Sequence, residues 1–374
     1  MLTAPVPADN QRPPAAASKR MLVWRRFTRH RLAVAGLAIT ALLAFVSLFG
    51  EFFAPYSAEY YRADYAYAPP QRVRLLDGGW NPHAYGYTST ADPETFEVVW
   101  DVDTSVKIPL GFFVRGESYE LLGLVESDIH FFGPRDPDAA APVYLLGADR
   151  NGHDLLSRII VGTRVSMSIG LVAVALAFLL GVVVGSVSGA IGGWVDSLLQ
   201  RIGEGVLSLP TLPLWLGLSA ALPPTWDPLK RYVAISAILA MTAWTTLARA
   251  VRSRFLSLRE EDFVRAAYVD GARLPRIVFR HMLPSFSSHL IAALTLSVPA
   301  TVLAETSLSF LGLGLQPPVV SLGVLLHDAE NIRVVTSAPW LLLPGVVLVA
   351  AVLALNVVGD GLRDAVDPYQ AGRP

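Results

Sequence analysis

The chain has 374 residues, of which 53% are hydrophobic and only 16% charged, and its 30 basic residues nearly balance its 31 acidic ones. This balance argues against a nucleic-acid-binding protein, and the absence of cysteine excludes a disulfide framework, a thiolate metal site and a cysteine nucleophile. A mean hydropathy of +0.45 predicts a membrane protein with several spans.

Residues 1–31 are expected to form an N-terminal cytoplasmic tail, which is disordered over the Pro- and Ala-rich residues 1–18. The uncharged run 32–50 predicts the first transmembrane helix. A cleaved signal peptide is the alternative interpretation of this run. We favour a retained span because the run is longer than a usual signal-peptide core and no A-x-A cleavage site follows it.

The next segment, 51–145, carries 15 acidic and 6 basic residues, which is typical of a segment outside the cytoplasm. Apolar and mostly acidic residues alternate over 96–103, which indicates a half-buried strand. Shorter strands are predicted over 72–76, 110–115 and 120–125. We therefore expect a small β-rich external insertion between the first and second spans.

Residues 146–368 are expected to form a core of five further spans. The segment 149–154 faintly resembles a calcium loop but lacks the ligand spacing, so we expect it to start an amphipathic helix lying at the membrane interface. The uncharged runs that predict spans two to six are 165–195, 205–226, 232–248, 282–304 and 334–359. The predicted fold class is an all-α polytopic membrane protein with six transmembrane helices.

The basic residues give the orientation of these spans. Residues 1–31 have seven basic residues against one acidic, and the loop 249–281 has eight against four. Basic segments remain in the cytoplasm, and four spans separate these two, so both are expected on the inner side. The N-terminus and the C-terminal tail at 369–374 should then both be cytoplasmic, in a multi-pass membrane protein.

Several residues within the predicted spans stand out. Gly181, Gly185 and Gly189 are four residues apart on one helix face, where small side chains allow close helix packing, either within this chain or against another subunit. Glu305 and His289 are ionisable residues near the two ends of one span. Each could line a translocation path, but the alternative interpretations are that Glu305 is a helix-end carboxylate reaching water and that His289 is a packed polar residue.

No enzyme motif is present. The chain has no phosphate-binding loop of the G-x-x-x-x-G-K-[ST] type, no H-E-x-x-H or G-x-S-x-G sequence and no paired metal ligands. We expect a non-enzymatic protein with no metal site and no cofactor of its own. An ion-coupled transporter or channel is an alternative, but the spans offer few ionisable residues for it.

The cytoplasmic loop 250–284 is the most informative part of the sequence. Its residues 259–284 predict two short helices joined at Gly271, with Phe263, Ala266, Ala267 and Tyr268 on one compact face that could enter a groove on another protein. Asp270 precedes the joining glycine. Leu283 and Pro284 mark the entry into the next span.

This loop resembles the EAA loop of ABC-importer permeases of the bacterial binding-protein-dependent type. Ala266, Ala267, Gly271, Leu283 and Pro284 match the motif at its spacing, whereas Arg265 stands where the family usually has Glu. Three further segments are similar to the dipeptide/oligopeptide branch of that family, and the single N-terminal span is similar to its C-type subunit. These segments are 146–166, 304–318 and 356–368.

The resemblance implies a type I ABC importer fold in which this chain forms half of the pore, as a multi-pass protein of the bacterial cytoplasmic (inner) membrane. The implied partners are a second homologous permease, two cytoplasmic ATPase subunits that bind the ATP and magnesium, and an external substrate-binding protein. The loop would couple the pore to the ATPase, and the substrate would be a di- or oligopeptide. Nickel chelates and other small solutes remain open because related permeases transport them.

Overall fold

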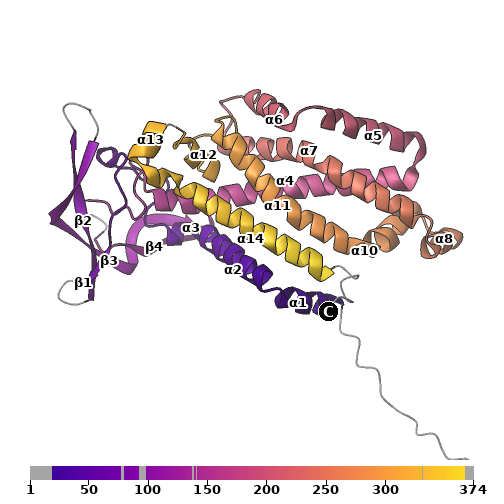
Figure 1. The fold of residues 1–374 in the computed structure, drawn as a ribbon, viewed down its shortest axis with the longest axis horizontal. Coiled ribbons are helices and arrows are strands. Elements are labelled where there is room, and N and C mark those ends of the chain that lie inside the picture. Colours follow the sequence, from indigo (N-terminus) through magenta and orange to yellow (C-terminus); the bar gives the residue numbers. More distant parts are fainter. Residues whose placement is uncertain are drawn as a thin grey trace, which may run out of the picture.

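A computed structural model describes residues 19–76, 80–91, 98–136, 139, 141–330 and 332–366. The tails predicted at 1–18 and 369–374 lie outside these residues. Figure 1 shows an elongated helical bundle with a β region at one end. Five helical segments in the described part of the chain are long and apolar enough to cross a membrane. They are α2 (Arg31–Leu48), α4 (Leu155–Ile191), α7 (Pro228–Leu258), α11 (Ser287–Phe310) and Pro339–Val366, which comprises a 3₁₀ turn (Pro339–Leu342) and α14 (Leu343–Val366).

The first predicted span corresponds closely to α2. It follows the basic helix α1 (Lys19–Arg29) after a single intervening residue, His30. The imidazole of His30 caps α2 by accepting a hydrogen bond from the backbone N–H of Ala33 at 3.1 Å. The short helix α3 (Gly50–Phe53) follows α2, and a 3₁₀ turn at Ala63–Tyr65 leads towards the strands.

Helix α4 is longer than the predicted second span. Its 37 residues extend about 55 Å, well beyond the roughly 30 Å of a hydrocarbon core. It begins directly at the N-cap Asp154, whose carboxylate accepts the backbone N–H of Ser157 at 2.8 Å. The separate interfacial helix that we expected here is therefore wrong. Leu155 and Ile159 are buried against Leu341 and its neighbours instead of facing lipid headgroups.

The predicted span 205–226 is not a single helix. The chain forms α5 (Gly193–Ser208) and α6 (Thr211–Ala220), separated at Leu209 and Pro210. Proline removes a helical hydrogen bond and disfavours helical geometry in the residue before it, which explains the break. Figure 1 shows α5 and α6 following one another alongside α7, so the chain still passes from one end of the bundle to the other.

The remaining helices complete the bundle. Helix α7 leads into α8 (Asp262–Val269), α9 (Leu274–Ile277), a π-helical turn (Val278–Met282) and α10 (Leu283–Ser285), which precedes α11. After α11, α12 (Leu322–His327) and α13 (Ile332–Ser337) lie at the same end of the bundle as the β region (Figure 1). The fifth and sixth predicted spans correspond to α11 and α14, which each begin and end several residues later than expected.

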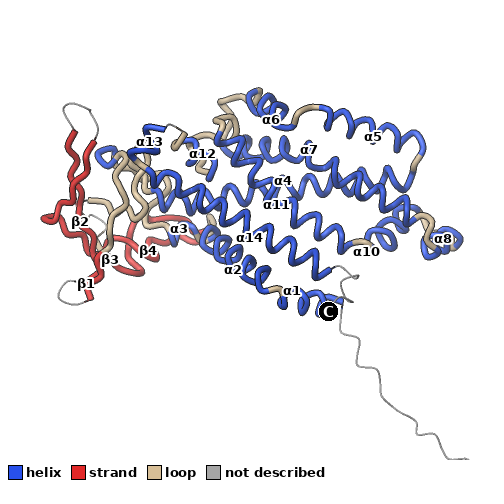
Figure 2. The backbone as a smooth tube through the Cα atoms, in the orientation of Figure 1, coloured by secondary structure: helices blue, strands red, loops and turns tan. Residues whose placement is uncertain are grey.

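The β region is one antiparallel sheet with strand order β1-β2-β3-β4, coloured red in Figure 2. Its strands are β1 (Arg74–Leu76), β2 (Trp80–Ala91), β3 (Val98–Leu121) and β4 (Val125–Pro134). Strand β3 pairs with β2 through its first half and with β4 through its second half. The strand predicted over 120–125 is wrong. Leu122 and Gly123 take positive φ angles of 54° and 68°, so this segment is the hairpin turn between β3 and β4.

The two ends of the bundle differ in what they carry. Helices α1 and α8 and the last turns of α14 lie at the end far from the β strands (Figure 1). A buried cluster that includes Tyr65, Ile108, Leu110 and Tyr144 joins the base of the sheet to the segment before α4. The long helices therefore connect a β-capped end to an end that carries the predicted coupling loop.

Candidate coupling and transport sites

The predicted loop forms a compact turn between α8 and α9. Gly271 has φ of +75°, a conformation that glycine adopts without strain. The N–H groups of Gly271 and Ala272 donate to the carbonyl oxygens of Tyr268 and Ala267, each at 3.0 Å. This pair of bonds is the Schellman arrangement that ends helices. It explains physically why a glycine stands between the two helices.

Only part of the predicted docking face points outwards. Val264 is fully buried and Ala267 is nearly so, whereas Phe263 is 42% and Val269 87% exposed. The expectation that Ala267 belongs to the exposed face is therefore wrong, because its methyl group packs into the protein. Ala266, Arg265 and Asp270 are exposed beside the apolar side chains.

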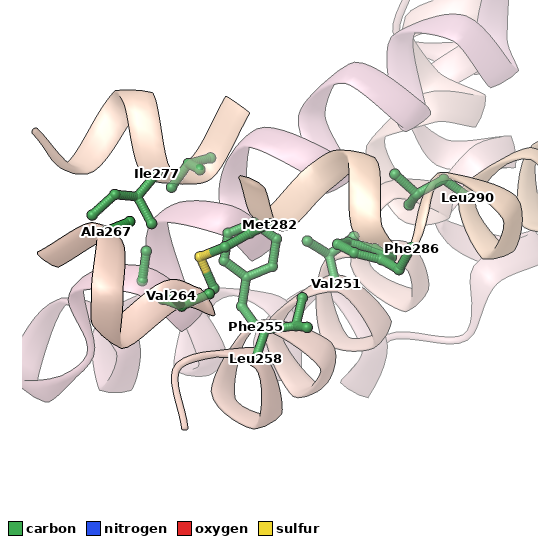
Figure 3. Close-up of a cluster of buried hydrophobic side chains, with 11 residues drawn as sticks. Val251, Phe255, Leu258, Val264, Ala267, Ile277, Met282, Phe286 and Leu290 are labelled. Carbon is green, nitrogen blue, oxygen red and sulfur yellow. The ribbon is translucent and has the colours of Figure 1, made fainter. Parts of the chain in front are cut away.

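Buried side chains fasten this loop to the long helices (Figure 3). Val264 and Ala267 of α8 belong to one apolar cluster with Phe255 of α7 and Met282 of the π-helical turn. The cluster continues to the beginning of α11 and to the last turns of α4. Further members are Ala190, Val251, Leu258, Ile277, Val278, Phe286 and Leu290. The loop and the ends of three long helices therefore share one packed core, which resists internal rearrangement.

Charged and terminal residues of the loop complete its surface. Arg265 forms an ion pair with Glu260, and both side chains are largely exposed. An exposed pair of this kind adds little stability, so both groups are available to a partner. Leu283 packs against the apolar cluster, while Pro284 is exposed in α10. The structure thus brings together Leu283 and Ala267 but leaves Pro284 and Gly271 at the surface.

The three spaced glycines face α7. A methyl group at Gly185 would lie 2.5 Å from the carbonyl oxygen of Ala248, and one at Gly189 would lie 2.5 Å from Cβ of Phe255. A methyl group at Gly181 would lie 2.9 Å from Leu247. Of the two alternatives left open by the sequence, the structure therefore shows packing within the chain. The absent side chains allow α4 and α7 to approach closely.

A polar cluster at the same end was missed by sequence reasoning. Arg252 of α7 donates two hydrogen bonds to Asp196 of α5, at 2.5 and 2.6 Å, and Ser188 of α4 donates to the same carboxylate. A bidentate arginine–carboxylate pair fixes both distance and orientation. Three helices are fastened here, although the residues are separated by 56 positions in the sequence and no local pattern connects them.

Glu305 is fully buried rather than placed at a water-filled mouth. It accepts hydrogen bonds from Ser166 at 2.9 Å and from Ser309 at 2.8 Å. The same two hydroxyl oxygens accept the backbone N–H groups of Leu322 and Leu315, at 3.1 and 3.0 Å. The carboxylate therefore organises the turn after α11 against α4. Its role in a translocation path stays a prediction.

His289 lines a cavity of about 260 Å³ between α4, α7 and α11. The other polar side chains of its wall are Thr246 and Ser297, and the rest is apolar with several alanines. The cavity lies next to the contact between α4 and α7 at the three spaced glycines, because Leu247 both lines the cavity and packs against Gly181. The wall of this cavity is therefore weakly polar, and the role of His289 in a translocation path stays a prediction.

The start of α4 contains a buried charge cluster. Asp149 accepts hydrogen bonds from Arg158 and from His153 at 2.9 Å. Burial alone would raise the pKa of Asp149, but the bond from His153 and the charge of Arg158 outweigh it and lower the pKa. Burial raises the pKa of the neighbouring Asp154 to about 6. No group of three or more potential metal ligands occurs in the ranges that the structure describes.

The five apolar helices of spanning length define a multi-span membrane protein, in which one loop is fastened to the ends of three of these helices. The sequence matches the family model described as "binding-protein-dependent transport system inner membrane component" over residues 179–371, and the chain belongs to this family. Residues 18–70 match a second model, the N-terminal TM domain of oligopeptide transport permease C. In this family ATP is hydrolysed by separate subunits, so the chain is a component of a transporter.

Curated relatives carry similar names. The chain is 33% identical over 353 residues to the oligopeptide transport system permease protein OppC of Mycobacterium tuberculosis, covering 94% of this chain and 95% of the relative. It is 38% identical over 223 residues to the dipeptide transport system permease protein DppC of Alkalihalophilus pseudofirmus, covering 59% and 71%. The OppC protein of Bacillus subtilis is 36% identical over 223 residues, covering 59% and 70%. The match to the Mycobacterium tuberculosis protein covers 94% of this chain, so most of the β region must be part of it.

Proposed function

We propose that this chain is one pore-forming subunit of an ATP-driven importer that takes up di- or oligopeptides delivered by an external binding protein. The observation that carries the proposal is the loop around Gly271, which is exposed at its tip and packed at its base into the ends of α4, α7 and α11. The names of the relatives, which refer to dipeptides and oligopeptides, support the substrate class.

The proposed topology has six crossings, with α5 and α6 together forming the third. The arrangement of Figure 1 supports it, because both α4 and α7 run from the β-region end to the α8 end and the chain must return between them. The basic tail before α2 and the basic loop at α8 lie at the same end, which is the cytoplasmic one under the positive-inside rule. The β region then lies outside the membrane.

The proposed partners are a second homologous permease, two cytoplasmic ATPase subunits and an external binding protein. The ATPases would hold ATP and magnesium. The outer surface of the loop carries exposed Phe263 and Val269 among several arginines. The matching groove on the ATPase should therefore offer an apolar pocket with an acidic rim, including an acidic group facing Arg265.

In the proposed mechanism, closure of the ATPase pair displaces α8. The apolar cluster transmits this displacement because Val264 and Ala267 are packed against Phe255 and Met282 without an intervening flexible segment. The inner ends of α4, α7 and α11 would then move together and reshape the cavity at His289, as alternating access requires.

The decisive test replaces Gly271 by tryptophan in the assembled transporter. No described atom lies within 4 Å of a Cβ added there, so the large side chain enters the docking surface and not the protein core. The matched control is Gly193→Trp, at a glycine that also has positive φ and open space. We expect the Gly271 variant to lose ATPase co-purification and peptide uptake in vesicles, and the control to retain both. Normal uptake and co-purification by the Gly271 variant would contradict the proposal.

A further inference from the structure

Helix α1 and the residues that join it to α2 form an unusually basic segment. Residues 19–31 contain six lysines and arginines and no acidic residue. Arg25, Arg29 and Arg31 are exposed and form no ion pair within the part of the chain that the structure describes. These three exposed positive charges, which have no ion-pair partner in the described chain, require an external anionic partner or water.

One face of α1 is fixed against the bundle. Phe27 is buried with Ala33 and Ala365, and Val23 packs against the same cluster. Gly361 permits this contact, since a methyl group there would lie 2.3 Å from Cβ of Ala33. The helix therefore has a defined orientation beside the last turns of α14, and its other faces have defined directions.

Large apolar side chains are exposed on those other faces. Met21 is 50%, Leu22 46% and Trp24 57% exposed, and Trp24 stacks on Phe27 with ring centroids 6.0 Å apart. Tryptophan and arginine together are typical of the membrane–water interface. Only His30 separates α1 from the first span, so these side chains belong to the helix that directly precedes that span.

We propose that α1 binds the headgroups of anionic phospholipids at the inner leaflet, with Arg25 and Arg29 on the phosphates and Trp24 among the adjoining acyl chains. The proposal rests on the orientation given under the proposed function. The occupant follows from charge complementarity: six positive charges directly inside a span attract anionic lipid, at about 1 kcal/mol for each basic residue near the surface. One lipid chain contact and several charges together make a stable anchor.

The test uses the full-length chain in lipid nanodiscs without ATPase subunits. The protein has no cysteine, so Thr28→Cys provides a single attachment point for a fluorophore on α1. Two nanodisc samples are compared, both made of phosphatidylcholine. Each contains a trace of one lipid with a nitroxide quencher near its headgroup, which is phosphatidylglycerol in the first sample and phosphatidylcholine in the second. We expect stronger quenching by the anionic lipid, and we expect the excess to fall when salt is added.

Three variants make the test specific. Arg25→Gln with Arg29→Gln should lower the apparent affinity for the anionic lipid by about fivefold for each arginine removed. Arg25→Lys with Arg29→Lys should retain most of it. The control, Arg273→Gln with Arg276→Gln, removes the same charge from the loop at the same end and should change nothing.

Several outcomes would overturn the proposal. The first is equal quenching by the two lipids, and the second is a loss of affinity for the anionic lipid that is as large in the control as in the Arg25→Gln, Arg29→Gln variant. The third is the absence of quenching by either lipid, which would assign the exposed face of α1 to a protein partner. None of these outcomes bears on the coupling loop, whose test measures ATPase binding and uptake. Failure of the lipid proposal is therefore distinguishable from failure of the proposed function.

Discussion

Replacing Gly185 by alanine tests the contact between α4 and α7 directly. The added methyl group would lie 2.5 Å from the backbone oxygen of Ala248 and 2.7 Å from Cβ of Val251. Ordinary contacts begin at about 3.4 Å, and neither neighbour is the flexible end of a side chain. The two helices must therefore separate locally by nearly an ångström.

Two opposing effects determine the net change in stability. Overpacking of a well-packed contact costs about 1–3 kcal/mol. Alanine is also a better helix former than glycine by about 1 kcal/mol, which offsets part of that cost. We expect Gly185→Ala to lower the free energy of unfolding by up to about 2 kcal/mol. The control Gly217→Ala lies within α6, where no described atom comes within 4 Å of an added Cβ, so it should be neutral or stabilising.

Thermal unfolding of the purified protein in mild detergent measures both variants. Gly181→Ala supplies an intermediate case, because the three atoms nearest to its methyl group, at 2.9 to 3.0 Å, all belong to the side chain of Leu247 and none to the backbone of α7. The expected order of stability is Gly217→Ala, then Gly181→Ala, then Gly185→Ala. Equal melting temperatures for Gly185→Ala and Gly217→Ala would refute the reasoning, since the backbone of α7 would then not limit the approach of α4.

Glu305→Ala should lower the free energy of unfolding by about 1–3 kcal/mol for each serine hydroxyl that loses its acceptor. Glu305→Gln keeps an accepting oxygen, so it should lower stability less in the same melting assay. Equal losses of stability in the two variants would contradict this role of Glu305. Burial raises the pKa of Asp154 from 3.8 to about 6, so the folded chain keeps a proton that the unfolded chain releases, and stability falls as pH rises between these values. Asp154→Asn keeps the helix cap and should raise the free energy of unfolding by up to about 3 kcal/mol above pH 6, because each unit of pKa difference corresponds to 1.36 kcal/mol. This gain in stability should vanish below pH 3.8, and a gain that did not depend on pH would contradict the assignment. Asp196→Ala should destabilise the protein more than the double variant that also carries Arg252→Met, because only the single variant leaves the guanidinium of Arg252 unpaired. If the stability losses of the two single variants simply add in a double-mutant cycle, the Arg252–Asp196 ion pair does not contribute to stability.

Local patterns in the sequence predict much of the fold. Long uncharged runs located α2, α4, α7, α11 and α14, because the bilayer requires about 20 apolar residues in each span. They could not locate the break between α5 and α6, since an apolar run does not show how a proline at its centre is accommodated. The π-helical turn at Val278–Met282 likewise has no signature in the sequence of the loop that contains it.

The candidate sites were predicted less completely than the fold. The motif identified the loop and its glycine, but only three-dimensional packing distinguishes buried Ala267 from exposed Ala266 one residue away. Glu305 was noticed because an ionisable residue in a span is expensive. Its partners Ser166 and Ser309 were not, because serine is common in such helices and Ser166 lies 139 residues away.

Helix α4 connects the features that a transport cycle would use. In the half of α4 nearer α8, Gly185 lies against the backbone of α7, and Ala190 belongs to the cluster that holds α8. In the half nearer the β region, a methyl group at Gly170 would lie 2.6 Å from the side chain of Val302 in α11, and Ser166 bonds to Glu305. Such close backbone contacts leave α4 little freedom to bend independently of its neighbours. A displacement of the loop must therefore either move α4 together with α7 and α11 or separate the helices at these glycine contacts.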